Sequence, residues 1–332
     1  MRADEPVQLG GTSVKVTRLG LGSAPLGNLF QEVADVDARS VVATAYDAGI
    51  RFFDTAPLYG YGLAERRLGK VLSEKSRDSF VLASKVGRLL RAGVPPDPTQ
   101  FHEGEAFYKS APEVSPVFDF SYDGVMRSVE ESLERLSLDR IDILHIHDPD
   151  EHYEAALDGA YRALATLRSE GVIGAVGAGM NQAEMLVRFA TDADFDCFLL
   201  AGRYTLLDQS AFRELLPLCR AKGISIIIGG VFNSGLLADP RPGARFDYVP
   251  ADQDLVLRAQ RLDAVCRRHG VPLKAAALRF PLGHPAVAAV LVGCRSVAEL
   301  EENIRMFGTD VPAPLWEELR SEGLLDEELP TP

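Results

Sequence analysis

Short apolar runs recur along the chain, and each is followed by a stretch with helical periodicity. The runs are rich in Val, Ile and Leu, which is typical of strands buried on both faces. Between them, apolar residues return at three- and four-residue spacing, as in 41–45 and 126–136. The candidate strands are 19–22, 51–54, 80–84, 141–145, 172–176, 197–200, 224–228 and 287–292. Eight such βα units predict an α/β fold, a closed (β/α)8 TIM barrel.

The two ends of the chain add elements to this barrel. Segment 7–16 alternates in two halves around Gly10-Gly11, which is the signature of a β-hairpin with a two-residue turn. We expect this N-terminal hairpin to plug the bottom of the barrel. The only tryptophan, Trp316, lies in a stretch that predicts a C-terminal helix. No boundary interrupts the pattern, so we expect residues 1–332 to form one barrel domain.

Charge and composition exclude several classes of partner. The chain has 48 acidic and 35 basic residues, and its formal charge of −13 argues against a nucleic-acid backbone as ligand. No apolar run approaches the roughly 20 residues that cross a bilayer, and the first residues lack a signal-peptide core. We therefore expect a cytoplasmic protein without a membrane partner. The four cysteines are far apart and lack metal-ligand spacing, which predicts reduced thiols and no metal site.

Two long connections interrupt the βα rhythm. Residues 87–121 hold five prolines and five aromatic residues, and this composition favours a lid or substrate wall over a disordered linker. Residues 229–252 form the second connection and contain small residues at 230–235.

Four residues with complementary chemistry follow predicted strands: Asp54, Tyr59, Lys85 and His147. The carboxyl ends of barrel strands build the active site, so we expect these side chains to meet there. A phenol titrates near ~10 in water and can exchange protons at neutral pH only if its pKa is lowered. Lys85 paired with Asp54 would supply that effect for Tyr59.

These residues stand in motifs that resemble the aldo-keto reductase family: D-T-A-x-x-Y-G at 54–60, S-K at 84–85 and I-H-D-P at 146–149. The resemblance implies that Tyr59 is the general acid or base, that Lys85 stabilises its phenolate and that Asp54 anchors Lys85. It also implies that His147 binds the substrate oxygen, without any metal. His145 lies deeper on the same strand face, and we interpret it as a packed or supporting histidine.

The resemblance further implies a nicotinamide cofactor that lies across the strand ends, although this chain departs from the family pattern. Asn181 replaces the usual Ser-Asn pair, and the usual glutamine after the sixth strand is absent, which leaves Arg203 or Tyr204 for the amide. We expect the pyrophosphate to bind a loop of small residues. The full set of cofactor candidates is Gly22, Asn181, Gly230, Val231, Phe232, Asn233, Ser234, Gly235, Leu236, Gly293, Arg295, Glu299, Glu302 and Asn303.

Residues 292–303 resemble the adenosine-binding segment of the family, with Glu302 and Asn303 where the family contacts adenine, and this segment decides between the two nicotinamide cofactors. Gly293 and Glu299 stand where NADP-specific members carry a lysine and an arginine that bind the 2′-phosphate. A carboxylate repels that phosphate and accepts ribose hydroxyls instead, so we favour NAD. Arg295 keeps NADP as the second choice.

Segments 147–151 and 201–208 resemble the aldose 1-dehydrogenase branch, which acts on L-fucose or D-threo-aldoses, and a related pyridoxal dehydrogenase. Oxidation of an aldose at C1 to a lactone is thus the expected reaction, with Asp148, Arg203 and Tyr204 as substrate-binding candidates and Asp119 beside them. The alternative is a broad NADPH-dependent aldehyde or ketone reductase with an aromatic pocket. A non-catalytic nucleotide-binding subunit and a Schiff-base enzyme using Lys85 remain further alternatives. The chain is expected to be a monomer or small homo-oligomer.

Overall fold

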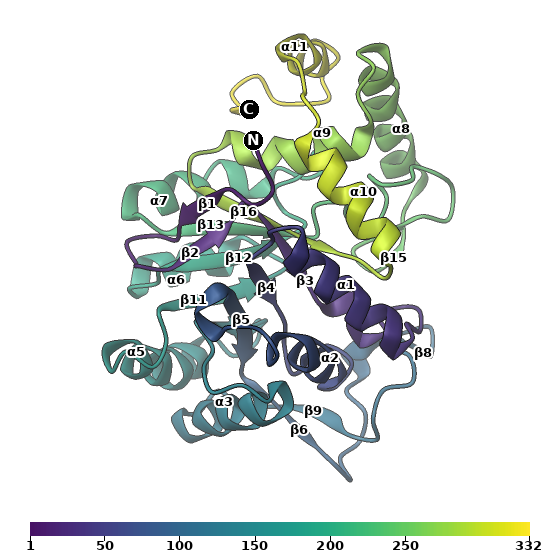
Figure 1. Ribbon diagram of the computed structural model, residues 1–332. Helices are drawn as coiled ribbons and strands as arrows, with labels where there is room; N and C mark the ends of the chain where they lie inside the picture. Colours follow the sequence, from purple (N-terminus) through teal and green to yellow (C-terminus); the bar gives the residue numbers. More distant parts are fainter.

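A closed barrel of eight parallel strands forms the core of the protein, and the computed structural model describes residues 1–332. Each strand pairs with the next one in the chain, and the last pairs back with the first (Figure 1). The strands are β3 (Leu19–Gly22), β4 (Phe52–Asp54), β5 (Val81–Val86), β10 (Ile143–His147), β11 (Ala175–Met180), β12 (Cys197–Ala201), β13 (Ser225–Gly229) and β16 (Val287–Gly293). This arrangement confirms the predicted TIM barrel.

The fourth and fifth barrel strands, β10 and β11, begin two to three residues later than predicted. Asp142 is the reason at β10, because its carboxylate accepts hydrogen bonds from the Leu82 amide (2.8 Å) and from Arg77 (2.6 Å) below the barrel. In β11 the run 177–179 contains two glycines, which have low strand propensity. The apolar pattern therefore did not include these residues in the predicted strand. The shift makes His147 the last residue of its strand and places 177–180 inside the barrel wall.

Helices cover the outside of the barrel and bury their apolar faces against the strands. Ser121 caps α3 (Tyr122–Leu136), because its hydroxyl accepts a hydrogen bond from the Gly124 amide at 3.1 Å, and the buried face of this helix includes Val125, Val129 and Leu136. The helices are α1 (Asp35–Asp47), α2 (Leu63–Leu72), α3 (Tyr122–Leu136), α4 (Tyr153–Ala155), α5 (Arg162–Ser169), α6 (Glu184–Asp192), α7 (Leu215–Lys222), α8 (Gln253–Arg268), α9 (Leu273–Arg279), α10 (Val297–Gly308) and α11 (Ala313–Ser321), with a π-helical turn at Ala156–Tyr161.

A hairpin of β1 (Pro6–Gln8) and β2 (Lys15–Thr17) closes the bottom of the barrel. Leu9 and Val16 are fully buried there, against the innermost side chains of the strands, so the predicted plug is confirmed. The predicted two-residue turn is wrong, because residues 9–14 connect the strands. Gly10 has φ of 56°, and a Cβ on it would lie 2.5 Å from the carbonyl oxygen of Asp196. The turn is therefore shaped by contact with the barrel floor.

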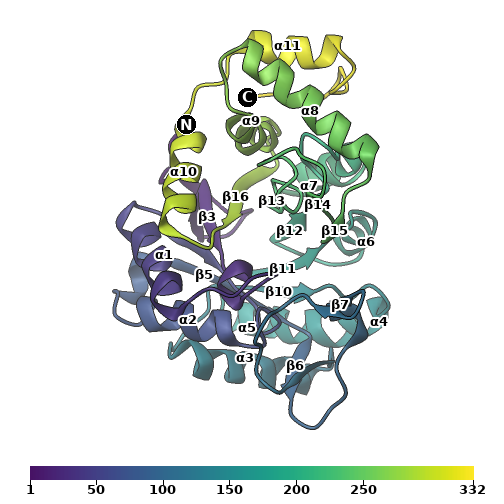
Figure 2. The same cartoon turned by 90° about the vertical axis from the view of Figure 1, so that its right-hand side faces the viewer.

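Both long connections fold over the top of the barrel. Residues 87–121 contain two antiparallel pairs, β6 (Arg88–Arg91) with β9 (Ser115–Phe118) and β7 (Phe101–His102) with β8 (Glu105–Ala106). The second connection contains β14 (Arg245–Phe246) and β15 (Val249–Pro250). Figures 1 and 2 show the β6 segment at the end of the molecule farthest from α11.

The C-terminal region packs on the outside of the barrel. α11 contacts α8, and the two helices lie together in Figure 2. Trp316 of α11 is 1% exposed and lies against Phe280, which confirms the predicted C-terminal helix. All four cysteines are free and buried, as expected. None of the helices combines the length and the apolar character that a membrane span requires.

Candidate active site

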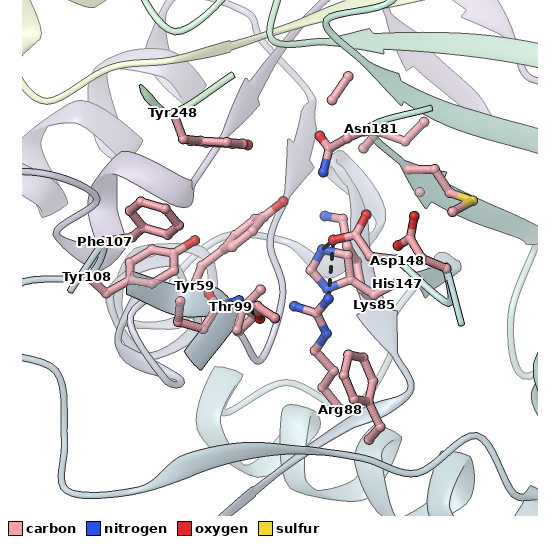
Figure 3. A pocket seen from close by; sticks show the side chains of 18 of the residues that line it. Tyr59, Lys85, Arg88, Thr99, Phe107, Tyr108, His147, Asp148, Asn181 and Tyr248 are labelled. Carbon is pink, nitrogen blue, oxygen red and sulfur yellow. Dashed lines mark hydrogen bonds and ion pairs between the residues drawn. The ribbon is translucent and has the colours of Figure 1, made fainter. Parts of the chain in front are cut away.

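Tyr59, Lys85 and His147 converge at the carboxyl end of the barrel (Figure 3), and Asp54 joins them there through its ion pair with Lys85. Lys85 Nζ donates to Asp54 Oδ1 at 2.6 Å and to the Thr55 carbonyl at 2.9 Å, and both partners of this ion pair are at most 3% exposed. The ammonium lies 4.7 Å from the centroid of the Tyr59 ring. His147 presents its ring edge-on to the same phenol, with 5.9 Å between centroids. The structure thus places the four residues predicted from the sequence in one site.

The main chain itself fixes the position of Tyr59. The turn after it contacts the short helix Ala24–Gly27 so closely that a Cβ on Gly60 would lie 2.4 Å from the carbonyl oxygen of Gly27. Gly60 also has φ of 62°, which disfavours side chains. The Tyr59 carbonyl accepts a hydrogen bond from the Ala64 amide in the first turn of α2 (3.1 Å). Backbone contacts therefore hold the main chain at Tyr59 from both sides.

Charges near the phenol oppose the expected lowering of its pKa. Burial raises the pKa of Tyr59 well above its ordinary value, and the Asp54 carboxylate raises that pKa further. The charge of Lys85 is already balanced by Asp54 at 2.6 Å. Burial, Arg88 and Lys85 lower the pKa of His147 well below its ordinary value. The site therefore holds a neutral phenol and a neutral imidazole that can both hydrogen-bond to a substrate oxygen.

His145 lies one layer below this site, as expected for a packed histidine. It is fully buried, and neither ring nitrogen has a hydrogen-bond partner. Burial, together with Lys85, lowers its pKa to about 3. Its neighbour in β11 is Gly177, where a Cβ would lie 2.2 Å from His145 Nδ1. The glycine in β11 makes the room that this ring occupies.

A cavity of about 450 Å³ opens above the four residues. In Figure 3, Phe107, Tyr108 and Tyr248 stand on one side of it, and His147 and Asp148 stand on the other. Both long connections contribute to the walls, so the proline-rich one lies where either a lid or a substrate wall is expected. Further lining residues are Leu29, Leu58, Arg88, Thr99, Gln100, Phe118, Asn181, Leu199 and Ala201.

Sequence reasoning missed Arg88 and Tyr248 as lining residues. Arg88 comes three residues after Lys85, and this short spacing from a strand end was the available signal. Tyr248 is brought over the cavity by the fold of its loop, where its ring centroid is 5.9 Å from those of Phe30 and Phe107. Nothing in the local sequence marks that contact.

The structure separates the predicted substrate-binding residues. Asp148 lines the cavity, beside His147. Tyr204 does not: it is fully buried in the protein interior, with its ring 5.1 Å from that of Phe280. Asp119 is half-buried outside the cavity and accepts a hydrogen bond from the Ser121 hydroxyl at the start of α3 (2.6 Å). Tyr204 lies outside the cavity because its ring packs in the apolar core. Asp119 lies outside it because its carboxylate binds the residue that caps α3.

Arg203 also lies outside the cavity, since it joins two loops. Its guanidinium donates to both carboxylate oxygens of Asp247, at 3.0 and 2.6 Å, and lies 3.6 Å from Asp208. Asp247 and Tyr248 both have positive φ, and the Tyr248 amide donates to the Ser234 hydroxyl at 3.1 Å. Arg203 therefore supports the loop that carries Tyr248 rather than contacting substrate directly.

Replacing Arg203 by Ala is expected to loosen that loop. Cleavage after Tyr248 by chymotrypsin should become several-fold faster, while the free energy of unfolding falls by roughly 1 kcal/mol. Limited proteolysis followed by mass spectrometry, together with urea unfolding, measures both. Arg213→Ala is the control, because Arg213 pairs with Asp326 and Glu328 near the C-terminus. Unchanged cleavage in the Arg203 variant would contradict this role.

The cofactor candidates form a path along one side of the barrel top. Asn181 follows β11 directly and lines the cavity. Gly22 and Gly293 are register partners in the neighbouring strands β3 and β16. Between them and the cavity lies loop 230–236, in which Val231 and Leu236 point into the core. Asn233 donates to the Gly202 carbonyl at 3.2 Å, and its side-chain oxygen is buried without a partner.

Several amides of the 230–236 loop are already used within the loop, contrary to an open phosphate cradle. The Asn233 amide donates to Gly230, the Gly235 amide donates to Phe232 and the Leu236 amide donates to Asn233. Asn233 and Ser234 both have φ near 50°. Successive tight turns cause this pattern, and they leave fewer amides free for a phosphate than the sequence suggested.

A second cavity of about 390 Å³ lies beside the start of α10. Arg295, Ser296 and Glu299 line it on one side, and Glu32 and Asp37 line it on the other. Glu299 accepts a hydrogen bond from the Arg295 amide at 2.8 Å and lies 3.7 Å from its guanidinium. The one cation of this cavity is thus paired and surrounded by carboxylates.

Two predicted adenosine contacts lie outside this second cavity. Glu302 pairs with Lys274 at 2.5 Å, and Asn303 is buried with its amide donating to Cys294 Sγ at 3.3 Å. Both residues lie in α10, on a face that packs toward neighbouring helices. The Asn303 side-chain oxygen is buried without a partner.

Comparisons with known proteins find matches along nearly the whole chain. The profile of the Aldo/keto reductase family matches residues 18–321. Pyridoxal 4-dehydrogenase of Microbacterium luteolum is 43% identical, over 98% of this chain and 99% of that protein. D-threo-aldose 1-dehydrogenase of a Pseudomonas species is 42% identical over the full length of both. The solved aldo-keto reductase AKR11C1 of Bacillus halodurans is 25% identical, with a TM-score of 0.73 over 96% of this chain and 95% of that one.

Proposed function

Because the chain belongs to the aldo/keto reductase family of nicotinamide-dependent oxidoreductases, we propose that it oxidises an aldose at C1 to the lactone, with NAD as cofactor. The observation that carries this proposal is the buried Lys85–Asp54 ion pair beside Tyr59 and His147 at the floor of a cavity. The Schiff-base alternative is disfavoured, since Lys85 Nζ is engaged by Asp54 at 2.6 Å and by the Thr55 carbonyl at 2.9 Å. A free amine would be needed for that chemistry.

The residues along the predicted path fit a nicotinamide dinucleotide. Gly22 leaves space at the end of its strand, whereas Gly293 packs against Pro25, and the buried side-chain oxygens of Asn233 and Asn303 lack partners in the protein. Asn181 supplies an amide within the cavity. When bound, the cofactor supplies the carbon that accepts or returns the hydride. The carboxylates of Glu32, Asp37 and Glu299 favour NAD, since they would repel a 2′-phosphate.

The side chains then have distinct tasks in the reaction. Tyr59 and His147 both hydrogen-bond to the reacting oxygen and hold its carbon in one place. During oxidation, the oxygen of Tyr59 first releases its own proton to bulk water and then takes the hydroxyl proton of the substrate. Lys85 is the cation beside that phenolate, at 4.7 Å from the ring centroid, and Asp54 orients Lys85, while burial and the Asp54 charge keep the pKa of Tyr59 raised. In reduction the same phenol donates its proton to the carbonyl oxygen.

The substrates in the names of the two relatives share one chemical feature that supports lactone formation. D-threo-aldoses and pyridoxal each carry an aldehyde and a hydroxyl group that close to a cyclic hemiacetal. Removal of a hydride from the hemiacetal carbon and of a proton from its hydroxyl gives a lactone directly. A cavity with aromatic rings on one side and polar groups on the other suits such a ring (Figure 3).

Initial rates with a panel of hemiacetals test this function. L-fucose, D-arabinose, L-galactose and pyridoxal should be supplied with NAD and with NADP, and the reduced nicotinamide followed by absorbance. We expect oxidation of at least one aldose, with the lactone identified by mass spectrometry. Failure with every aldose, under conditions where an aldehyde is reduced, would rule the proposal out.

The acidic second cavity predicts a cofactor preference that can be inverted. Wild type should have a higher kcat/KM with NAD than with NADP, and Glu299→Lys should lower that ratio by about tenfold, because it frees Arg295 and adds a phosphate ligand. Glu301→Lys is the matched control, because it makes the same charge change on an exposed face of α10. An equal shift in both variants would mean that general charge, not Glu299, sets the preference.

Reduction of aldehydes or ketones is the second candidate. The raised pKa of Tyr59 favours it, because a neutral phenol is ready to donate a proton. The aromatic side chains of Phe107, Tyr108 and Phe118 also suit an apolar aldehyde. Activity with aromatic aldehydes and NADPH, without aldose oxidation, would select this alternative.

A further inference from the structure

Asp148, the residue after His147, is held in an unusual position on the cavity wall. Its φ is 40°, in the left-handed region that non-glycine residues seldom adopt. The Asp148 amide donates to the Gly179 carbonyl at 3.0 Å, which fixes this backbone between β10 and β11. Such strain clusters at functional sites, where it directs a side chain. Here it directs a carboxylate, 18% exposed, into the cavity.

Arg88 faces this carboxylate from the other side. Its side chain is 8% exposed and lies over the Phe118 ring, at 4.9 Å from the centroid. The register of β6 with β9 pairs these same two residues. Arg88 Nε is buried and has no hydrogen-bond partner. The guanidinium is thus rigidly placed at the cavity and has unused donor capacity.

The contacts of Asp148 are long and concern one oxygen. Its Oδ2 atom lies 3.4 Å from the Arg88 guanidinium and 3.5 Å from His147 Nε2 (Figure 3). Both distances are at the outer limit of hydrogen bonding, so neither contact saturates the carboxylate. Burial also raises the pKa of Asp148 to about 6, despite Arg88. A ligand hydroxyl would complete the hydrogen bonding of both side chains, because it donates to the Asp148 carboxylate and accepts from the Arg88 guanidinium at once.

We propose that Arg88 and Asp148 form a specificity site for a hydroxyl on the carbon next to the reacting carbon. This inference rests on the proposed function, in which His147 binds the reacting oxygen. Because Asp148 lies beside that same imidazole nitrogen, a group bound to Asp148 stands next to the reacting oxygen. The pair thereby selects α-hydroxyaldehydes and the sugars derived from them over plain aldehydes.

Two aldehydes that differ only in this hydroxyl test the proposal. Initial rates of reduction are measured for 2-hydroxypropanal and propanal, and selectivity is the ratio of their kcat/KM values. Wild type should prefer 2-hydroxypropanal, and Asp148→Asn and Arg88→Gln should each lower the selectivity by about tenfold, the loss of one charge-assisted bond. Asn tolerates left-handed φ, so the Asp148 variant keeps its backbone. Circular dichroism of both variants checks their fold.

Asp78→Asn is the matched control. It neutralises an exposed carboxylate that pairs with Arg140 at 2.9 Å and does not line the cavity, so it should keep the wild-type selectivity. The proposal fails if wild type does not distinguish the two aldehydes, or if both substrates lose rate equally in the Asp148 and Arg88 variants. Because this test uses reduction, its outcome does not depend on sugar oxidation. Absence of aldose oxidation alongside a selective reduction would reject the proposed function and leave this site standing.

Discussion

Tyr59→Phe is expected to lower kcat by about 10²- to 10⁴-fold in both reaction directions, the range measured for loss of a general acid or base. The variant removes the only atom of the phenol that can transfer a proton, while the ring remains beside Lys85 and His147. Affinity for the nicotinamide cofactor should stay within a few-fold of wild type. Single-turnover rates and cofactor titration by fluorescence separate these two quantities.

The same change two residues later is the control. Tyr61→Phe removes a half-buried hydroxyl from the same turn. It leaves unchanged the Tyr59 hydroxyl beside the Lys85–Asp54 ion pair. It should keep kcat within a few-fold of wild type. If Tyr59→Phe retains most of its turnover, the proton donor is another group, and His147 becomes the first candidate. A protein that acts only as a nucleotide-binding subunit would have little turnover to lose in either variant.

Asp54→Ala is expected to destabilise the protein by about 3–5 kcal/mol, in addition to inactivating it. The substitution leaves the Lys85 ammonium, 1% exposed, without its carboxylate and with the Thr55 carbonyl as its remaining acceptor. An unpaired charge in such a site costs more than the pair contributes when intact. Urea unfolding at neutral pH, analysed by linear extrapolation, gives the change in free energy.

Two comparisons give this prediction a sharp control. The double variant Asp54→Leu/Lys85→Met removes both charges and should recover much of the loss. Asp35→Ala breaks an ion pair with Arg67 in which the carboxylate is 72% exposed, so its effect should be small. If Asp54→Ala is as stable as Asp35→Ala, the ammonium of Lys85 is not confined as the structure places it.

The sequence was sufficient for the barrel and for the grouping of the candidate catalytic side chains because both follow from short-range rules. Strand periodicity located eight strands, and the carboxyl ends of those strands located Asp54, Lys85 and His147. Periodicity placed the start of two strands two to three residues too early. At β10 the cause is the hydrogen bonding of Asp142, and at β11 it is the glycines, which lack the apolar side chains of a strand pattern. Each of those failures was local.

The substrate wall was not predictable in the same way, because contacts between distant loops build it. Tyr204 follows a strand, as the catalytic residues do, yet packing against Phe280 turned it into the core. Arg203 forms an ion pair with Asp247, a residue 44 positions away, and does not reach the cavity. Tyr248 reaches the cavity through contacts with Phe30 and Phe107. No periodic pattern encodes such pairings, and the same holds for the pKa of Tyr59, which depends on a charge balance among several side chains.

The close contact between Gly27 and Gly60 has a consequence for how this enzyme could change its specificity. It locates Tyr59, the proposed proton donor, through the main chain, whereas the loops at 98–108 and 245–250 contribute one side of the cavity wall. Directed evolution could therefore randomise those loops without moving Tyr59, provided that both glycines are kept. A library built this way would sample new substrates on an unchanged reaction centre, and any variant at Gly27 or Gly60 would be expected among the inactive clones.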